Sequence, residues 1–339
     1  MAKELIKAVL LHLGPNGMAG DSYLDEGWRE RNPKVRHWVA SKEMKFDKKV
    51  WDDAVKLMKE GDLNTIVINM RDGMVFPSHP ELAIKGSWTP DEMRAELKRL
   101  RGMGFDVIPK LNFSTTHSAW MKQYRRVVSS PEYYKVCADV IHDVCEIFGK
   151  PRLFHLGWDE EEEYAQRQLP MMILRRGTLW WHDFLFTVRE VEKHGVRAWS
   201  WSSRNMLHHD EFMANMPSSV LQTPAHYRND FEKRLVRNDA EIRAAEWPGR
   251  VAGPLSFTEL DAAGRFDMMA CGSNWNNDEN FEAVVRFCHK HIQHKDRLKG
   301  FLMAPWQHTI AKNRAHLLRA CDQVSAGKKL WESLVSTST

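Results

Sequence analysis

The chain has 339 residues, of which 43% are hydrophobic, and its 49 basic and 45 acidic side chains give a formal net charge of +4 at pH 7. The two signs are mixed along the sequence, so no concentrated basic surface of the kind that binds nucleic acid is expected. No run reaches the roughly 20 apolar residues that a membrane-spanning helix requires. The length suits one large α/β barrel.

Short β-branched or apolar runs alternate with longer amphipathic segments, which is the pattern of a parallel sheet with crossover helices. The predicted strands are residues 8–13, 65–69, 106–111, 153–157, 197–201, 219–222, 268–272 and 300–304. The clearest predicted helices are residues 47–60, 90–102, 131–148, 178–194, 278–293 and 311–324. Eight strands in this alternation predict a (β/α)8 TIM barrel that forms a single domain over residues 1–339.

Two segments interrupt the alternation. The connection 14–46 follows the first strand, so on a barrel it would lie over the active face. Residues 223–267 contain two Pro-Gly neighbourhoods, and loops with short helices are expected there. Residues 1–7 lack the apolar core of a signal peptide. The protein is therefore either cytoplasmic, or secreted or periplasmic with its signal peptide removed.

The chain has five cysteines, an odd number without a Cys-x-x-Cys pair: Cys137, Cys145, Cys271, Cys288 and Cys321. This pattern argues against a zinc ribbon and against a disulfide framework. Buried free thiols are expected instead.

The most informative segment is 154–160, an apolar run that ends in the adjacent acids Asp159 and Glu160. Successive side chains of a strand point to opposite faces, so two neighbouring acids share one side only where the strand gives way to a loop. In an α/β barrel, the carboxyl ends of the strands carry the catalytic groups. The simpler alternatives are a helix-cap role for Asp159 and a solvated acidic turn for Glu160.

Over residues 60–165 the sequence resembles the family 20 glycoside hydrolases, the β-hexosaminidases. The ordered elements of the resemblance are Asp72, then Pro80, Leu82 and Gly86, then Thr89, then 104–109, then His117, and finally 155–160. The resemblance implies a barrel whose substrate supplies the nucleophile, the oxygen of its own 2-acetamido group. By this resemblance Glu160 is the general acid, and Asp159 orients and polarises the acetamido group. Independently, a glycosidic oxygen must be protonated before it leaves, and an acid beside a carboxylate holds its proton more tightly.

The same resemblance gives substrate-binding roles to His155, His117 and Asp72. His155 shares a strand face with Gly157 and Asp159, His117 follows the third strand, and Asp72 ends the second. A core histidine, an exposed loop histidine and a turn aspartate are the respective structural alternatives.

Aromatic side chains follow later strands. The resemblance places Trp201, which alternates with Trp199 on the fifth strand, and Trp306, at the end of the last strand, in the walls of the sugar subsite. It makes the Tyr227 hydroxyl a partner of the acetamido oxygen. Core packing and a plain loop position are the alternatives for these residues.

The sequence also departs from the family pattern. Lys110 and Asn112 stand where the family has two acids, Gln307 replaces the acid that follows the last tryptophan, and residues 8–13 contain no sugar-holding arginine. Trp158 replaces a small residue ahead of the acid pair, so its indole is expected to reshape the substrate site beside the anomeric centre, and Gln307 is expected to contact the sugar. The family's small domain ahead of the barrel is also expected to be absent.

The expected function is that of an exo-acting, retaining glycoside hydrolase of the β-N-acetylhexosaminidase type. A glycosidase for sugars without an acetamido group and a non-catalytic carbohydrate-binding barrel are the alternatives. The expected partner is a carbohydrate, with no cofactor, and the oligomeric state is not indicated. The ligand-like run 208–210 lies at a predicted helix start, so no metal site is expected there.

Overall fold

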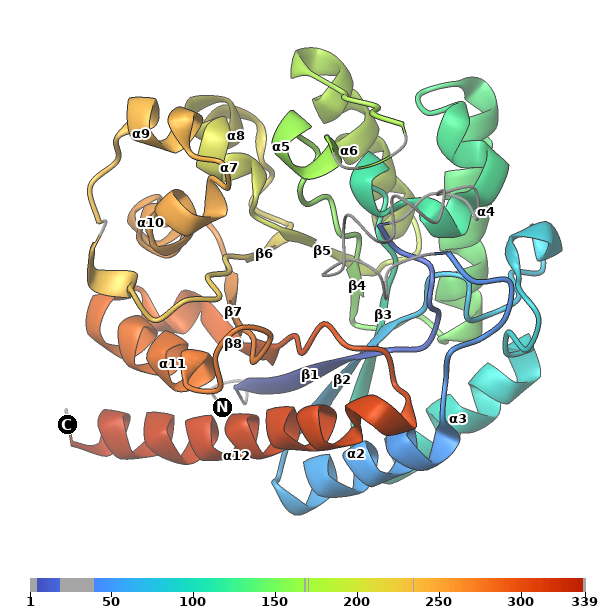
Figure 1. The fold of residues 1–339 in the computed structure, drawn as a ribbon, viewed down its shortest axis with the longest axis horizontal. Coiled ribbons are helices and arrows are strands. Elements are labelled where there is room, and N and C mark those ends of the chain that lie inside the picture. Colours follow the sequence, from blue (N-terminus) through green and yellow to red (C-terminus); the bar gives the residue numbers. More distant parts are fainter. Residues whose placement is uncertain (1–4, 19–39, 168, 170, 234, 338–339) are drawn as a thin grey trace.

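The computed structural model describes residues 5–18, 40–167, 169, 171–233 and 235–337. Its strands are β1 (Ile6–His12), β2 (Thr65–Asn69), β3 (Asp106–Lys110), β4 (Leu153–His155), β5 (Arg197–Trp201), β6 (Leu221–Thr223), β7 (Met268–Gly272) and β8 (Leu298–Met303). They pair in parallel in chain order, and β8 pairs with β1 to close the barrel (Figure 1). The predicted (β/α)8 fold is therefore confirmed.

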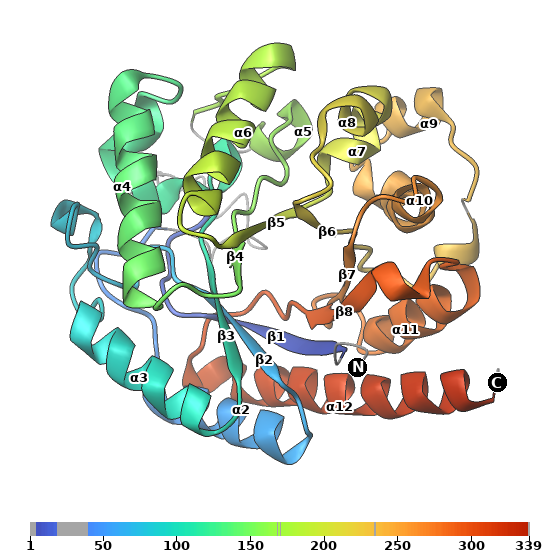
Figure 2. The same ribbon diagram turned by 180° about the vertical axis from the view of Figure 1, so that it is seen from behind.

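The helices surround the barrel, as Figures 1 and 2 show from opposite sides. They are α2 (Lys48–Glu60), α3 (Pro90–Gly102), α4 (Pro131–Ile147), α5 (Glu163–Gln166), α6 (Gly177–Glu192), α7 (Arg204–Leu207), α8 (His209–Asn215), α9 (Asp239–Ala244), α10 (Gly249–Ala262), α11 (Asn280–His291) and α12 (Arg314–Ser336). Short 3-10 segments cover Pro80–Leu82, Thr115–His117, Ala119–Arg126, Phe231–Lys233, Lys295–Arg297 and Ala311–Asn313. The long α12 lies between α2 and α11 and closes the ring of helices.

Local sequence signals account for several helix boundaries. Thr89 caps α3 with a reciprocal capping box, because its hydroxyl accepts from the Glu92 N–H while the Glu92 carboxylate accepts from the Thr89 N–H. Ser130 caps α4 with a single hydrogen bond, because its hydroxyl accepts from the Tyr133 N–H. Pro131 occupies the first turn of the helix. The region 223–267 is more regular than expected, because α10 runs for 14 residues with Pro254 inside it.

The apolar core has two layers. Inside the barrel, alternate residues of the strands meet around Val67, Ile108, Leu153 and Leu302. A larger layer of buried side chains fills the space between the strands and the helices. All five cysteines are buried and free, as predicted.

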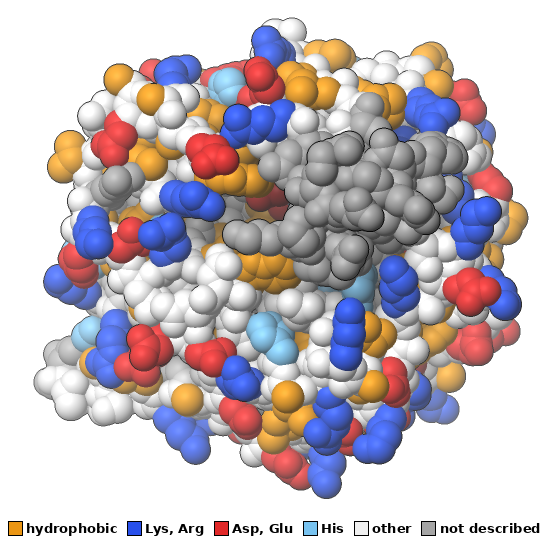
Figure 3. All heavy atoms as spheres, viewed as in Figure 1, with side chains coloured by type: hydrophobic (Ala, Val, Ile, Leu, Met, Phe, Trp, Pro, Cys, Tyr) orange, Lys and Arg blue, Asp and Glu red, His pale blue; other side chains and the backbone are white. Residues whose placement is uncertain are grey.

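The surface mixes both signs of charge. On the face seen in Figure 3, basic and acidic side chains are interspersed around the residues drawn in grey. Of the connection 14–46, residues 19–39 lie outside the described part, so its expected position over the active face is not addressed. Among the described helices, none is long and apolar enough to cross a membrane.

Candidate active site

The acid pair follows β4, and the backbone there is shaped for it. Gly157 has φ of 77°, and a Cβ at this position would lie 2.8 Å from the Cα of Asn112 and closer still to its amide. Only glycine fits such a close approach in the left-handed region. Trp158 and Glu160 also have positive φ, at 66° and 58°. Strained backbone of this kind clusters at functional sites, and here it places both acids on the same side of the barrel mouth.

Asp159 and Glu160 both contact the same histidine. The Nε2 atom of His117 lies 3.3 Å from Asp159 Oδ2 and 3.3 Å from Glu160 Oε2. His117 comes from the loop after β3, so two neighbouring strand ends build the group. The side chain of Glu160 is 33% exposed, against 14% for Asp159, so Glu160 is the acid that solvent and a substrate reach more easily.

Asp159 is held as a carboxylate. Burial alone would raise its pKa, but His117, Lys110 and the Asn112 amide together hold the pKa of Asp159 well below its usual value. Asn112 Nδ2 donates to Asp159 Oδ1 at 2.6 Å. The Asn112 oxygen accepts from the backbone N–H groups of Ser114 and Trp158, both at 3.1 Å, which fixes the orientation of the amide. The site therefore keeps a stable anion beside Glu160.

His117 is held as a cation. Burial works against its charge, but Asp159 and Glu160 raise the pKa of His117 to about 9. In addition, the hydroxyl of Thr116 donates to the backbone carbonyl of Glu160 at 2.6 Å, which ties the histidine loop to the acid loop. The imidazolium thus neutralises part of the charge that two adjacent acids would otherwise impose on each other.

This cation makes stability depend on pH. Because the folded-state pKa of His117 is above the value near 6.5 of an unfolded histidine, its contribution is complete below pH 6.5 and is lost as pH rises through 9. We expect the stability advantage of the wild type over His117→Gln to shrink by about 1.4 kcal/mol per pH unit in this window. Urea unfolding of both proteins at pH 6, 7.5 and 9.5 measures it. An advantage that stays constant over this range would contradict the imidazolium assignment.

Two further cations lie beneath the acids. Burial lowers the pKa of Lys110 to about 8 and that of Arg71 to about 10, although Asp159 pulls both in the opposite direction. His155 lies in the same layer, where burial and Lys110 hold its pKa well below the usual value. His155 is therefore neutral, and its Nδ1 accepts from the Gly157 N–H at 3.0 Å, an arrangement that helps to shape the turn before Asp159.

Aromatic rings lie next to this layer, since the Trp201 ring is 4.7 Å from that of His155. The rings of Trp201 and Trp306 lie 5.7 Å apart, and Tyr227 lies 6.3 Å from Trp306. Trp199 packs on His155 at 4.6 Å deeper in the barrel. Trp306 and Tyr227 are half-buried, so they keep some surface for a ligand, whereas Trp199 belongs to the core.

Two expected substrate-binding residues, Trp158 and Asp72, are buried. The indole of Trp158 points outward between the barrel and α6, where it packs on Trp180 and Phe184 and donates to Thr187 Oγ1 at 3.0 Å. The expectation that this indole lies beside the anomeric centre is therefore wrong, because the positive φ of Trp158 turns its side chain away.

Asp72 is fully buried, and both of its carboxylate oxygens are hydrogen-bonded to Asn16. Burial raises the pKa of Asp72 to about 6. Asp72 therefore anchors the start of the 14–46 connection. Gln307 is half-buried beside Trp306, and no hydrogen bond joins it to the acids among the described residues.

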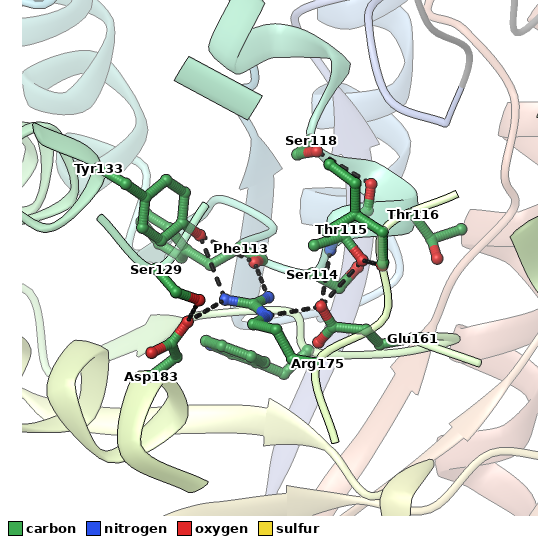
Figure 4. A network of polar contacts seen from close by, with 12 residues as sticks. Phe113, Ser114, Thr115, Thr116, Ser118, Ser129, Tyr133, Glu161, Arg175 and Asp183 are labelled. Carbon is green, nitrogen blue, oxygen red and sulfur yellow. Dashed lines mark hydrogen bonds and ion pairs between the residues drawn. The ribbon is translucent and has the colours of Figure 1, made fainter. Parts of the chain in front are cut away.

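A buried ionic network, which the sequence analysis missed, supports the loop that carries the acid pair (Figure 4). Arg175 lies between Glu161, at 2.7 Å, and Asp183 of α6, at 3.0 Å. The Arg175 guanidinium also donates to the carbonyl of Phe113 at 2.8 Å, and Thr115 Oγ1 donates to Glu161 at 2.8 Å. The network thus joins the loops after β3 and β4, which carry His117 and the acid pair.

The ligand atoms of His117, Asp159 and Glu160 lie within 4.8 Å of one another, so these three side chains are also able to approach a metal ion. His208 and His209, by contrast, are engaged by carboxylates, including Glu162 at 2.8 Å and Glu259 at 3.4 Å.

Comparison with known proteins supports the fold. No family model and no curated protein matches the sequence. Solved structures match well: a chitobiase from Flavobacterium johnsoniae (17% identity, TM-score 0.55, 85% of this chain and 49% of that one), and an exo-β-N-acetylglucosaminidase from Vibrio harveyi (13%, 0.54, 98% and 58%). A β-N-acetylhexosaminidase from Bacteroides fragilis matches with 11% identity and a TM-score of 0.58, over 93% of this chain and 64% of that one. The chain thus spans about half to two-thirds of the length of these proteins. It has the barrel fold of the family 20 β-N-acetylhexosaminidases, as its motifs predicted.

Proposed function

We propose that the protein is a retaining, exo-acting glycoside hydrolase for sugars with a 2-acetamido group. The observation that carries this proposal is that Asp159 and Glu160, at the carboxyl end of β4, both contact His117. The site places the more accessible carboxyl group of Glu160 beside the less accessible carboxylate of Asp159, and glycoside hydrolysis uses two carboxyl groups in different roles.

In the proposed reaction Glu160 donates its proton to the glycosidic oxygen, and the bond from that oxygen to the anomeric carbon breaks. The acetamido oxygen of the substrate forms a new bond to the anomeric carbon from the opposite face, which gives a cyclic oxazolinium. Asp159 accepts a hydrogen bond from the acetamido N–H and stabilises the positive charge. Glu160, now a carboxylate, takes a proton from water, and the water oxygen opens the ring with net retention.

The state of Asp159 supports this role. A carboxylate whose pKa is held low remains an acceptor over the whole working range of pH. Asn112 occupies one oxygen and His117 contacts the other, but each carboxylate oxygen has two lone pairs. Each oxygen therefore keeps a lone pair that is able to accept an amide N–H of the substrate. The half-buried rings of Trp306 and Tyr227 supply a face on which a sugar ring stacks.

A second candidate is a retaining glycosidase for sugars without an acetamido group, in which Asp159 itself attacks the anomeric carbon. The substitution of the family's acids by Lys110 and Asn112 favours it, because sugar recognition at β3 must differ. The ligand oxygens of Asp159 and Glu160 lie within 4.8 Å, well below the roughly 6.5–9.5 Å that an inverting enzyme needs. The proposal of net retention therefore applies to both candidates.

A panel of aryl glycosides with and without the 2-acetamido group separates the candidates. We expect hydrolysis of the 2-acetamido sugars, with competitive inhibition by a thiazoline that mimics the cyclised intermediate. Hydrolysis of only the sugars without the group, insensitive to the thiazoline, would favour Asp159 as the nucleophile. If no glycoside is hydrolysed but sugars still quench tryptophan fluorescence, the barrel binds carbohydrate without turning it over.

A further inference from the structure

Three metal-binding side chains converge on the outside of the barrel, between α4 and α6. His142 and Glu146 are four residues apart on α4, so they lie on the same face of the helix. His194 follows the end of α6, and the turn is completed at Gly195, which has φ of 70°. The imidazole rings of His142 and His194 lie 5.2 Å apart, with an angle of 47° between their planes.

The ligand atoms of these three residues all lie within 4.8 Å of one another. Ligands of a tetrahedral zinc ion, with bonds of about 2.0–2.2 Å, lie about 3.4 Å apart. The ligand atoms therefore need to approach one another by no more than about 1.4 Å. His142 and Glu146 are exposed and His194 is half-buried, so changes of rotamer are able to supply this approach.

The three side chains are not engaged by other groups. Within the described residues, none of them makes a side-chain hydrogen bond or an ion pair. His208 and His209 differ in this respect, because both already contact carboxylates.

We propose that His142, Glu146 and His194 bind a divalent transition-metal ion, with Zn²⁺ as the best match to two imidazoles and one carboxylate. Water completes the coordination on the solvent side. The ion would join the carboxyl-terminal part of α4 to the end of α6, next to the amino-terminal ends of β4 and β5. Asp159 and Glu160 lie at the opposite ends of these strands, so the site is independent of the proposed hydrolysis and serves to clamp two helices together.

Calorimetric titration of the full chain with ZnCl₂, after treatment with a chelator and in a buffer that does not bind zinc, tests the proposal. We expect one ion bound per chain at this cluster, with affinity reduced at least about 100-fold in His142→Ala and in His194→Ala, since losing a direct ligand costs no less than losing an outer-shell partner. Glu146→Gln, which keeps the size of the side chain, should weaken binding less. The melting temperature should rise with Zn²⁺ in the wild type but not in His142→Ala or His194→Ala.

Two controls distinguish this cluster from others. His182→Ala removes an exposed histidine of the same α6 helix and should leave zinc binding unchanged. His117→Gln removes the other candidate cluster, at the acid pair. Zinc binding that His117→Gln abolishes and that the His142 and His194 variants leave intact overturns the proposal, as does the absence of any saturable binding. Circular dichroism confirms that each variant is folded.

Discussion

Replacement of Glu160 by glutamine is expected to reduce kcat about 10²–10⁴-fold on a glycoside with a poor leaving group, such as an alkyl glycoside or a disaccharide. Glutamine keeps the shape of the side chain but has no acidic proton to give to the glycosidic oxygen. On a 4-nitrophenyl glycoside the loss in the first step should be smaller, because this leaving group departs with little protonation. Steady-state kinetics on the two substrates give the comparison.

The matched control is Glu163→Gln, three residues away in the exposed first turn of α5. It makes the same chemical change in the same acidic run and should leave kcat unaltered. Equal and small losses on both substrates in Glu160→Gln would mean that another group supplies the proton. His117→Gln is expected to alter the pH dependence of kcat/KM, since the imidazolium contacts both acids.

Replacement of Arg175 by methionine is expected to destabilise the protein by about 3–5 kcal/mol, because it leaves two carboxylates buried without their cation. Arg175, Glu161 and Asp183 are all fully buried, with side chains no more than 2% exposed. Burial already raises the pKa of Glu161 despite its contact with the guanidinium. The cation also stacks over the Trp158 ring at 4.1 Å, and this contact would be lost as well. Urea unfolding at pH 7 measures the effect.

Arg176→Met, at the exposed neighbouring position, is the control and should change stability by less than about 0.5 kcal/mol. If the two variants were equally stable, the network would contribute nothing beyond packing. Because Glu161 follows the acid pair directly, Arg175→Met should also lower activity at temperatures where the protein remains folded. That loss would identify Arg175 as a positioning residue for the loop after β4.

The barrel could be predicted because each strand is recognisable from its own local sequence. Their apolar runs are short and regularly spaced, and the structure places each of them within a few residues of the expected range. Helix α10 was harder to predict, because Pro254 and the surrounding glycines favour a break in the helix. The burial of Leu255 and Phe257 against the rest of the fold overrides that preference. The long α12 continues past residue 324 through Gly327, whose lack of a side chain lets the helix pack closely against Phe281.

The site was predictable only as far as strand alternation holds. His155 faces the barrel interior, where it packs against Trp199 and Trp201, as the period of two requires. Trp158 was misplaced because its positive φ interrupts that period, which no residue type reveals in advance. The role of Arg175 could not be read from the sequence, because its partners Glu161 and Asp183 are brought together only by the packing of α6 on the loop after β4.

The contact between Gly157 and Asn112 has a consequence for recognising relatives. Two backbone N–H groups fix the oxygen of the Asn112 amide, so its NH₂ group must face Asp159. An aspartate at position 112 would instead place a second carboxylate oxygen, which only accepts hydrogen bonds, against Asp159. No side chain fits at position 157 while the amide stands there. Asparagine and glycine at these two positions therefore act as one unit. Chains that share the pair are expected to share the same charge state of Asp159, even where the rest of the barrel has diverged.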